Sequence, residues 1–302
     1  MSRFSLTIVG AGSSSSTPML KCLLSKSPCA QCADASANGF ESPNHRLNPS
    51  ALLQVVDESS TTLRNLYVDP GKTFRESAIK VLKPRGVRYL DAVIITHDHA
   101  DACWGIDDLR EFTRDGEALD VYCDSRTLVS MRRVYPYLFD REGGGSAKTF
   151  VARVNWCVMS DAFDFFGVTV RPVPVYHGEG YINNGIVFES GPQKALYLED
   201  VSAIPDASAA TVQDEFDVAV VDMLSTKPYP THFSVDQAVH FATSLRAKKI
   251  RFVGMSHSLP FLETNEMLSR RLPHAQLGRD GEVVLDCARV GANADTDDHD
   301  TA

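Results

Sequence analysis

The segment Ile94-Ile95-Thr96-His97-Asp98-His99-Ala100-Asp101 decides the fold, because an apolar run stops there and metal-binding side chains follow at alternate positions. The apolar run predicts a buried strand whose end continues into a loop. Side chains at alternate positions of a chain that leaves a strand can be gathered toward one point. Two imidazoles and a carboxylate suit zinc, manganese or iron, and they leave coordination positions free for water. The segment therefore predicts a catalytic metal site.

Three further metal-type side chains lie where other predicted strands end. His177 follows the apolar segment 168–176, Asp200 follows 195–199, and His257 follows 250–256. A lone His-x-His pair is more often a solvated loop or a pair of packed histidines, but the repetition of one pattern favours a site. Open α/β sheets place their sites at the carboxyl ends of strands, so we expect these residues to meet at one sheet edge.

The composition and net charge indicate which classes of molecule the protein is expected to bind. The chain has 302 residues, of which 43% are hydrophobic and 23% charged, as in a folded protein with an ample core. A net charge of -9 disfavours generic nucleic-acid binding, although a local basic patch is not excluded. We find no membrane-spanning segment and no secretory signal, and the odd count of seven cysteines suits a reducing compartment. A cytoplasmic protein is expected.

Strand patterns alternate with helical patterns along the chain, which predicts a layered α/β fold. Strands are expected at 4–9, 51–56, 64–68, 91–96, 118–123, 168–175, 185–190, 194–199, 217–222, 250–255 and 282–286. Helices are expected at 73–82, 105–113, 125–138, 235–246 and 261–271, and Ser234 with Gln237 predicts a capping box at the start of the fourth. Residues 1–290 are expected to form one domain, followed by a disordered acidic tail at 291–302.

The ordered metal-type residues resemble the motifs of the metallo-β-lactamase superfamily across nearly the whole chain. Three other segments are similar to the branch that contains phosphoribosyl cyclic phosphate phosphodiesterase, and tRNA 3′-processing endonucleases (tRNase Z) lie nearby. These segments are Gly10-Ala-Gly12-Ser-Ser-Ser-Ser-Thr-Pro18, Asn44-x-Arg46-x-Asn48-x-Ser50 and Gly105-Ile-Asp107-Asp108-Leu-Arg110. The resemblance implies an αββα four-layer sandwich with a dinuclear metal centre between the sheets.

The resemblance also implies a division of the ligands between two divalent metals, zinc or manganese. His97, His99 and His177 would hold one metal, Asp101 and His257 the second, and Asp200 would bridge both. Such a pair can lower the pKa of a bridging water toward 7 and supply hydroxide. The familiar motif has a histidine directly after its aspartate, whereas this chain has Ala102. The second site is therefore expected to bind more weakly or to prefer a harder metal such as manganese.

The same resemblance assigns roles at the reacting group. Asp200 and Asp101 are expected to be catalytic together with His232, which lies just before a capped helix and would donate a proton to the leaving oxygen. The alternative for His232 is a helix-entry histidine that bonds the backbone. Arg110, Asn44 and Arg46 are candidates for substrate binding. The alternative, which is favoured for Arg110, is that it pairs with Asp107 or Asp108 to brace the loop. Asn44, Arg46 and Asn48 have the same two interpretations.

Cys22, Cys29 and Cys32 have the spacing C-x₆-C-x₂-C, which suits a structural zinc site. The cyclic phosphodiesterase branch has a comparable cluster of cysteines. No fourth ligand is evident from the sequence, and His274, His45 and Cys287 are candidates. The alternative is a free or redox-active thiol pair.

These observations predict a metal-dependent hydrolase that acts on a small linear or cyclic phosphodiester through a metal-activated hydroxide. The enzymatic alternatives are a tRNA 3′-processing endonuclease, which the acidic composition disfavours, and a hydrolase of thioesters, lactones or lactams. A hypothesis of another class is a noncatalytic metal-binding interaction protein, for which Ala102 is the only motivation. A small-molecule substrate is the expected partner, no membrane contact is expected, and a homodimer is compatible with every one of these hypotheses.

Overall fold

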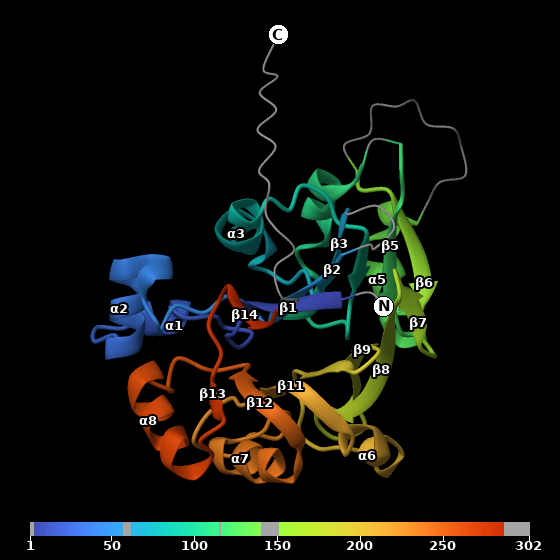
Figure 1. The fold of residues 1–302 in the computed structure, drawn as a ribbon. Coiled ribbons are helices and arrows are strands. Elements are labelled where there is room, and N and C mark those ends of the chain that lie inside the picture. The colour runs from blue at the N-terminus through green and yellow to red at the C-terminus, as the bar shows by residue number, and fades with distance from the viewer. Residues whose placement is uncertain (1–2, 57–61, 115, 140–150, 287–302) are drawn as a thin grey trace.

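Two seven-stranded sheets packed face to face form the centre of the molecule. The computed structural model describes residues 3–56, 62–114, 116–139 and 151–286. Figure 1 shows the sheet of the first half of the chain above that of the second half, with α3 (Phe74–Ser77) outside the first and α7 (Val235–Ser244) outside the second. This is the αββα arrangement that the family resemblance implies, and the predicted α/β fold class is confirmed.

Each sheet joins an antiparallel part to a parallel part. The first sheet has the order β14 (Glu282–Leu285), β1 (Arg3–Gly10), β2 (Ser50–Val56), β3 (Leu63–Val68), β4 (Ala92–Ile94), β5 (Leu119–Cys123), β6 (Val154–Val158). The second has the order β13 (Ala275–Leu277), β12 (Arg246–Val253), β11 (Glu215–Asp222), β10 (Gln193–Leu198), β9 (Ile182–Ser190), β8 (Val168–Tyr176), β7 (Phe163–Phe165). The parallel strands β3 to β6 and β10 to β13 present their carboxyl ends together at one edge of each sheet.

Successive side chains along each strand of the first sheet point to opposite faces of that sheet. Along β2, Leu53 packs in the core shared with the second sheet, whereas Leu52 packs against the outer helices. In β4, Ile94 belongs to the inner core and Val93 to the outer one. Because the side-chain period of a strand is two, a strand buried on both faces reads as a continuous apolar run.

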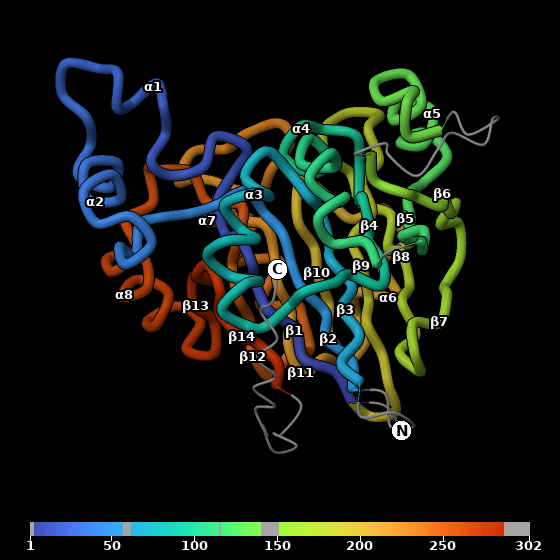
Figure 2. The backbone as a smooth tube through the Cα atoms, turned by 90° about the horizontal axis from the view of Figure 1, so that it is seen from above, coloured from blue at the N-terminus to red at the C-terminus, as the bar shows by residue number. Residues whose placement is uncertain are grey.

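The helices cover the outer faces and the ends of the sheets. The remaining α-helices are α1 (Leu20–Leu23), α2 (Ala30–Asn38), α4 (Ala100–Cys103), α5 (Ser125–Val134), α6 (Asp206–Val212) and α8 (Phe261–Arg271). Short 3₁₀ turns occupy Gly39–Glu41, Lys83–Arg85, Ile106–Phe112 and Pro136–Leu138, and Ala78–Leu82 forms a π-helical continuation of α3. Helix α7 begins with the predicted capping box, in which Ser234 and Gln237 exchange hydrogen bonds. In Figure 2, α1 and α2 project from one side of the molecule.

All eleven predicted strands are present, and the sequence missed β6, β7 and β13. The predicted helix at 105–113 is 3₁₀ rather than α, and the helices α1, α2, α4 and α6 were missed. Short strands at the sheet margins and helices without a regular apolar face carry little periodic signal. Among the described residues, no helix has the length and apolarity needed to cross a membrane. The predicted tail at 291–302 lies outside the described residues.

Candidate metal centre

Four donor side chains meet where strands of the two sheets end. His97 and His99 follow β4, His177 follows β8, and Asp200 follows β10. One ligand atom of each residue lies within 4.8 Å of a ligand atom of every other. The distance from His97 Nε2 to Asp200 Oδ2 is 3.2 Å, and that from His99 Nδ1 to His177 Nε2 is also 3.2 Å. Residues from both halves of the chain therefore form one cluster of metal-type donors.

The chemistry of this cluster fits a bound cation. His97 is 1% exposed, and its Nε2 atom has no hydrogen-bond partner among the described residues although it faces Asp200. A buried nitrogen without a partner is costly unless a ligand or ion satisfies it. Burial lowers the pKa of His177 to about 4 and also lowers that of His99, so both imidazoles are neutral near pH 7, as metal coordination requires.

Neighbouring groups hold each imidazole in one orientation. Thr96 Oγ1 lies 3.0 Å from His97 Nδ1 and donates to Asp69 Oδ2, which leaves His97 Nε2 facing the cluster. His177 Nδ1 lies 2.8 Å from the carbonyl oxygen of Thr231, which leaves Nε2 as its free nitrogen. A hydrogen bond on one ring nitrogen fixes the tautomer and directs the other nitrogen to the metal.

His99 is the most exposed of the three imidazoles, and an aromatic stack supports it. The Tyr181 ring stacks on the His99 ring at a centroid distance of 4.8 Å, and the Tyr181 hydroxyl donates to Asp98. On the other side of the tyrosine ring, the Arg126 guanidinium lies 3.8 Å from the ring centroid. The sequence analysis missed Asp98, Tyr181 and Arg126 as supporting residues, and nothing in their local pattern indicates that role.

Asp200 occupies a conformation that few residues adopt. Its φ is +53°, a left-handed value that aspartate and asparagine tolerate better than most residues. Burial disfavours ionisation of Asp200, but its contact with His97 and the charges of His97, His232 and His177 hold its pKa well below the usual value. The side chain is therefore an anion at the centre of the cluster.

A second group of donors shares Asp200 with the first. His232 Nδ1 lies 3.3 Å from Asp222 Oδ1 and 3.4 Å from Asp200 Oδ1. Asp222 is the last residue of β11, is fully buried, and accepts a hydrogen bond from the backbone N–H of Phe233. The sequence analysis missed Asp222, although the same signal that pointed to Asp200, an apolar strand that ends in an acid, was present.

The protonation of His232 predicts how the stability of the metal-free protein depends on pH. Burial alone would lower its pKa, but the charge and hydrogen bond of Asp222 and the charge of Asp200 raise it to about 9. A raised folded-state pKa stabilises the protein below the unfolded value near 6.5, and this stability is lost as the pH rises through about 9. The unfolding midpoint of the metal-free protein is therefore expected to fall between pH 7 and 9.5.

His232→Gln is expected to flatten this decline, as measured by thermal unfolding in chelator across the same pH range. Asp69 also titrates with a raised pKa, but the variant retains it. His232 lowers the pKa of Asp222, so the difference between the two proteins reports the His232–Asp222 pair. Equal slopes for parent and variant would contradict the pairing of His232 with Asp222.

His257 does not join Asp200, and here the structure corrects the sequence analysis. Its Nδ1 atom lies 3.3 Å from Cys29 Sγ, and its ligand atom lies within 4.8 Å of those of Cys22, Cys29 and Cys32. Backbone N–H groups donate to all three sulfurs, which suits thiolates. Three cysteines and one histidine could together hold a structural zinc, and His257 lies where the sequence left the fourth donor open.

The second predicted metal set, Asp101 with Asp200 and His257, is therefore not assembled. Asp101 is buried at the start of α4, but among the described residues no group of donors within 4.8 Å includes it. Ala102 beside it is buried and offers no donor. The physical reason is the fold: the loop after β12 directs its histidine toward the amino-terminal cysteines rather than toward the ends of β4 and β10.

All three candidates for substrate binding make contacts with other residues of the protein, as the bracing alternative expects. Arg46 is 1% exposed, and its guanidinium donates to the carbonyl oxygens of Ser256 and Leu259 on either side of the His257 loop. Asn44 donates to Asp34 and accepts from the backbone N–H of Phe261. Arg110 pairs with Asp107 at 2.8 Å, which is the bracing alternative. Asn48 bonds the carbonyl oxygens of Ser13 and Ser14.

Arg46→Gln is expected to destabilise the protein by about 3 kcal/mol, because it removes two charged hydrogen bonds from a buried site. The midpoint and slope of urea unfolding measure this change. Arg110→Gln is the matched control, since its partly exposed ion pair is worth roughly 1 kcal/mol or less. If Arg46→Gln raised KM with an unchanged unfolding midpoint, the substrate-binding role would stand instead.

A cavity lined by serines reaches the cluster through His232, which contacts Asp200. This cavity, of about 380 Å³, is lined by residues that include Ser13, Ser14, Ser15, Tyr229 and His232, together with Ser256 and His257. Hydroxyl groups dominate its polar lining, and no lysine or arginine lines it. The cavity therefore offers hydrogen bonds to a neutral polar group that lies next to the metal donors.

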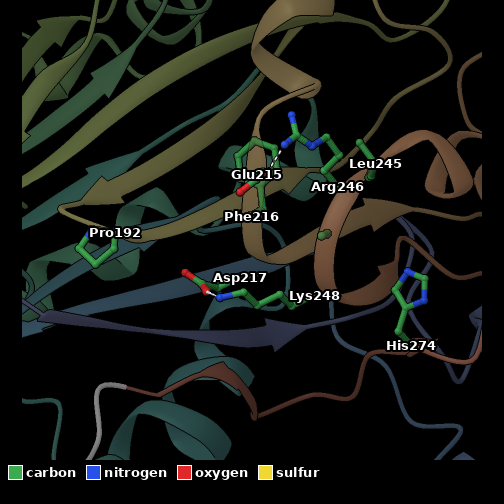
Figure 3. A pocket seen from close by; sticks show the side chains of 9 residues that line it. Pro192, Glu215, Phe216, Asp217, Leu245, Arg246, Lys248 and His274 are labelled. Atoms are coloured by element: carbon green, nitrogen blue, oxygen red, sulfur yellow. Dashed lines mark hydrogen bonds and ion pairs between the residues drawn. The ribbon is translucent and has the colours of Figure 1, made fainter.

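Another cavity, of about 440 Å³, lies at the opposite ends of the strands (Figure 3). Residues at the starts of β11 and β12 line this cavity. Its acidic residues form ion pairs with its basic residues, Glu215 with Arg246 and Asp217 with Lys248. Catalytic and ligand-binding groups of α/β sheets lie at the carboxyl ends, so this cavity is not part of the candidate site.

The two sheets form an αββα sandwich, and three histidines and an aspartate lie together where strands of both sheets end. This combination of fold and donor cluster is that of metal-dependent hydrolases. Residues 64–255 match the family model described as the β-lactamase superfamily domain. The chain belongs to the β-lactamase superfamily.

Solved structures agree with this family. A structure titled as a new diphosphatase from the PhnP family is 31% identical, with a TM-score of 0.76, and the alignment covers 94% of this chain and 97% of that one. Zinc-bound PqqB from Methylobacterium extorquens is 16% identical with a TM-score of 0.70, covering 95% of this chain and all of that one. Human tRNase Z, short form, is 14% identical with a TM-score of 0.56, covering 94% and 98%. The last two show the fold alone.

One curated protein also matches. The octanoyltransferase of Porphyromonas gingivalis is 24% identical over 285 residues, which are 92% of this chain. The chain spans 51% of the length of that relative. The similarity therefore concerns about half of that protein.

Proposed function

We propose that the protein is a metal-dependent phosphodiesterase that acts on a small phosphodiester. The observation that carries this proposal is the cluster of His97, His99, His177 and Asp200, with a buried, unpartnered nitrogen, beside a hydroxyl-lined cavity. The 31% identity to a protein titled as a diphosphatase supports phosphorus-oxygen chemistry. Divalent zinc or manganese at this cluster would supply hydroxide at neutral pH and polarise a phosphoryl oxygen.

The protein's own side chains then have distinct tasks. The anionic Asp200 and the neutral imidazoles provide the donors, while Thr96, Thr231 and Tyr181 keep the rings in place. The serine-lined cavity would hold the rest of the substrate through hydrogen bonds. His232 lines the same cavity, so its ring can present an N–H group to the leaving oxygen, in line with the proton-donor role inferred from the sequence.

A substrate panel tests the proposal. The manganese-loaded protein should hydrolyse a chromogenic phosphodiester and cyclic ribose phosphates, and it should leave thioesters and lactones of similar size unchanged. Preference for a thioester or lactone would replace phosphodiester hydrolysis with the other chemistry of the superfamily. Cleavage of the 3′ extension of precursor tRNA in preference to small diesters would favour the tRNA-processing alternative.

A further inference from the structure

The two carboxylate oxygens of Asp200 face two different groups of donors. Asp200 Oδ2 lies 3.2 Å from His97 Nε2, whereas Asp200 Oδ1 lies 3.4 Å from His232 Nδ1. A carboxylate that offers one oxygen to each of two donor groups is the arrangement that bridges a pair of cations. The second group, Asp222 and His232, is not the one that the sequence analysis expected.

The distances around His232 match metal coordination better than hydrogen bonding. A charged N–H···O hydrogen bond is typically about 2.7 to 2.9 Å long. Two ligands that each lie about 2.0 to 2.2 Å from a tetrahedral cation are themselves about 3.3 to 3.6 Å apart. His232 Nδ1 lies 3.3 Å from Asp222 Oδ1 and 3.4 Å from Asp200 Oδ1.

A buried carboxyl group with one unpartnered oxygen lies at the same place. Glu199 is 3% exposed, and within the part of the chain that the structure describes its Oε1 atom has no hydrogen-bond partner. A Cβ atom at Gly254 would lie 3.3 Å from Glu199 Oε1 and 2.3 Å from Asp222 Oδ1, so both oxygens face one space. Burying several carboxylates together is costly unless a positive charge compensates them.

Gly254 makes room for this group. Asp222 pairs with Val253 across β11 and β12, which places the Asp222 side chain beside residue 254. Any side chain at 254 would collide with Asp222 Oδ1, and the φ of Gly254 is +74°, which few other residues adopt. The absence of a side chain at 254 therefore lets Asp222 occupy the site.

We propose that Asp200, Asp222 and His232 hold a second divalent cation, with Glu199 as an adjacent carboxylate, in place of the expected set of Asp101, Asp200 and His257. Two carboxylate oxygens and one imidazole suit manganese or zinc. As a ligand through Nδ1, His232 keeps its proton on Nε2. His232 then acts on the leaving oxygen as an N–H hydrogen-bond donor.

Counting metals tests the proposal without any substrate. The full chain is stripped of metal, reloaded with one equivalent of Zn²⁺ and an excess of Mn²⁺, and desalted, and its metals are measured by mass spectrometry. Three metals per chain are expected, one of them in the cysteine site. Electron paramagnetic resonance should show coupled Mn²⁺ ions, because Asp200 joins the two sites.

Asp222→Asn is expected to lower the count to two and to leave the signal of isolated Mn²⁺. His232→Gln should do the same and serves as the second variant if Asp222→Asn fails to fold. Asp101→Asn is the matched control, since it removes a buried acid of the expected set, and it should retain three metals. Thermal unfolding and the retained zinc of the cysteine site report that each variant is folded.

Two metals in the parent chain, three in Asp222→Asn, or a loss in Asp101→Asn would overturn the proposal. The second cation site goes beyond the proposed phosphodiesterase activity, and the metal count tests it independently of that activity. A chain that binds three metals but cleaves no phosphodiester would keep the second cation site and remove the proposed function.

Discussion

Asp200→Asn is expected to lower kcat/KM for a chromogenic phosphodiester by roughly 10³- to 10⁴-fold, the equivalent of the several kcal/mol that metal catalysis supplies. The substitution removes the negative charge that faces both His97 and His232. It leaves the size of the side chain unchanged. Asparagine also tolerates the left-handed backbone of residue 200, so the fold should persist.

Steady-state hydrolysis by the manganese-loaded protein, together with the metal count, measures this effect. Asp206→Asn is the matched control because Asp206 is an exposed aspartate at the start of α6, away from the cluster. Activity that survives in Asp200→Asn would place the chemistry elsewhere. If neither protein turns over any substrate while partner binding is unchanged, the noncatalytic interaction protein becomes the better description.

Cys29→Ser is expected to remove one zinc ion per chain and to destabilise the fold by about 4 kcal/mol, as the loss of a structural metal does. Cys29 lies between the other ligands: its sulfur contacts His257 and accepts from the backbone N–H of Cys32. Serine is itself a good residue for the N-cap position that Cys29 holds in α2, so a lost cap does not explain the effect.

The zinc content and the urea midpoint are the measurements. Cys157→Ser is the control, because Cys157 is a free cysteine outside the zinc cluster. Turnover per metal-loaded chain should change much less than stability. Equal zinc content and equal midpoints in the two variants would show that the cysteines are a redox-active or inert thiol group.

The local sequence predicted the four donor residues of the candidate site. His97 and His99 lie in the one segment where a buried strand turns into a loop, and His177 and Asp200 follow apolar strands in the same way. The fold brings these four together because parallel strands end at a common edge. Local sequence did not predict the contacts of Arg46. Its position in a motif suggested substrate contact, whereas its side chain is buried and bonds the loop that carries His257.

The sequence by itself determined the layered α/β class, the position of the four donors at the ends of strands and the close spacing of the three cysteines, because each depends on periodicity or spacing along the chain. The two-sheet sandwich was implied by the family resemblance. Only the tertiary structure decided the partners of His257, Asp222 and His232. Those contacts join β12 to the amino-terminal cysteines and β11 to the loop after β10. Their geometry depends on how strands distant in sequence align across the sheets, and no local pattern encodes that alignment.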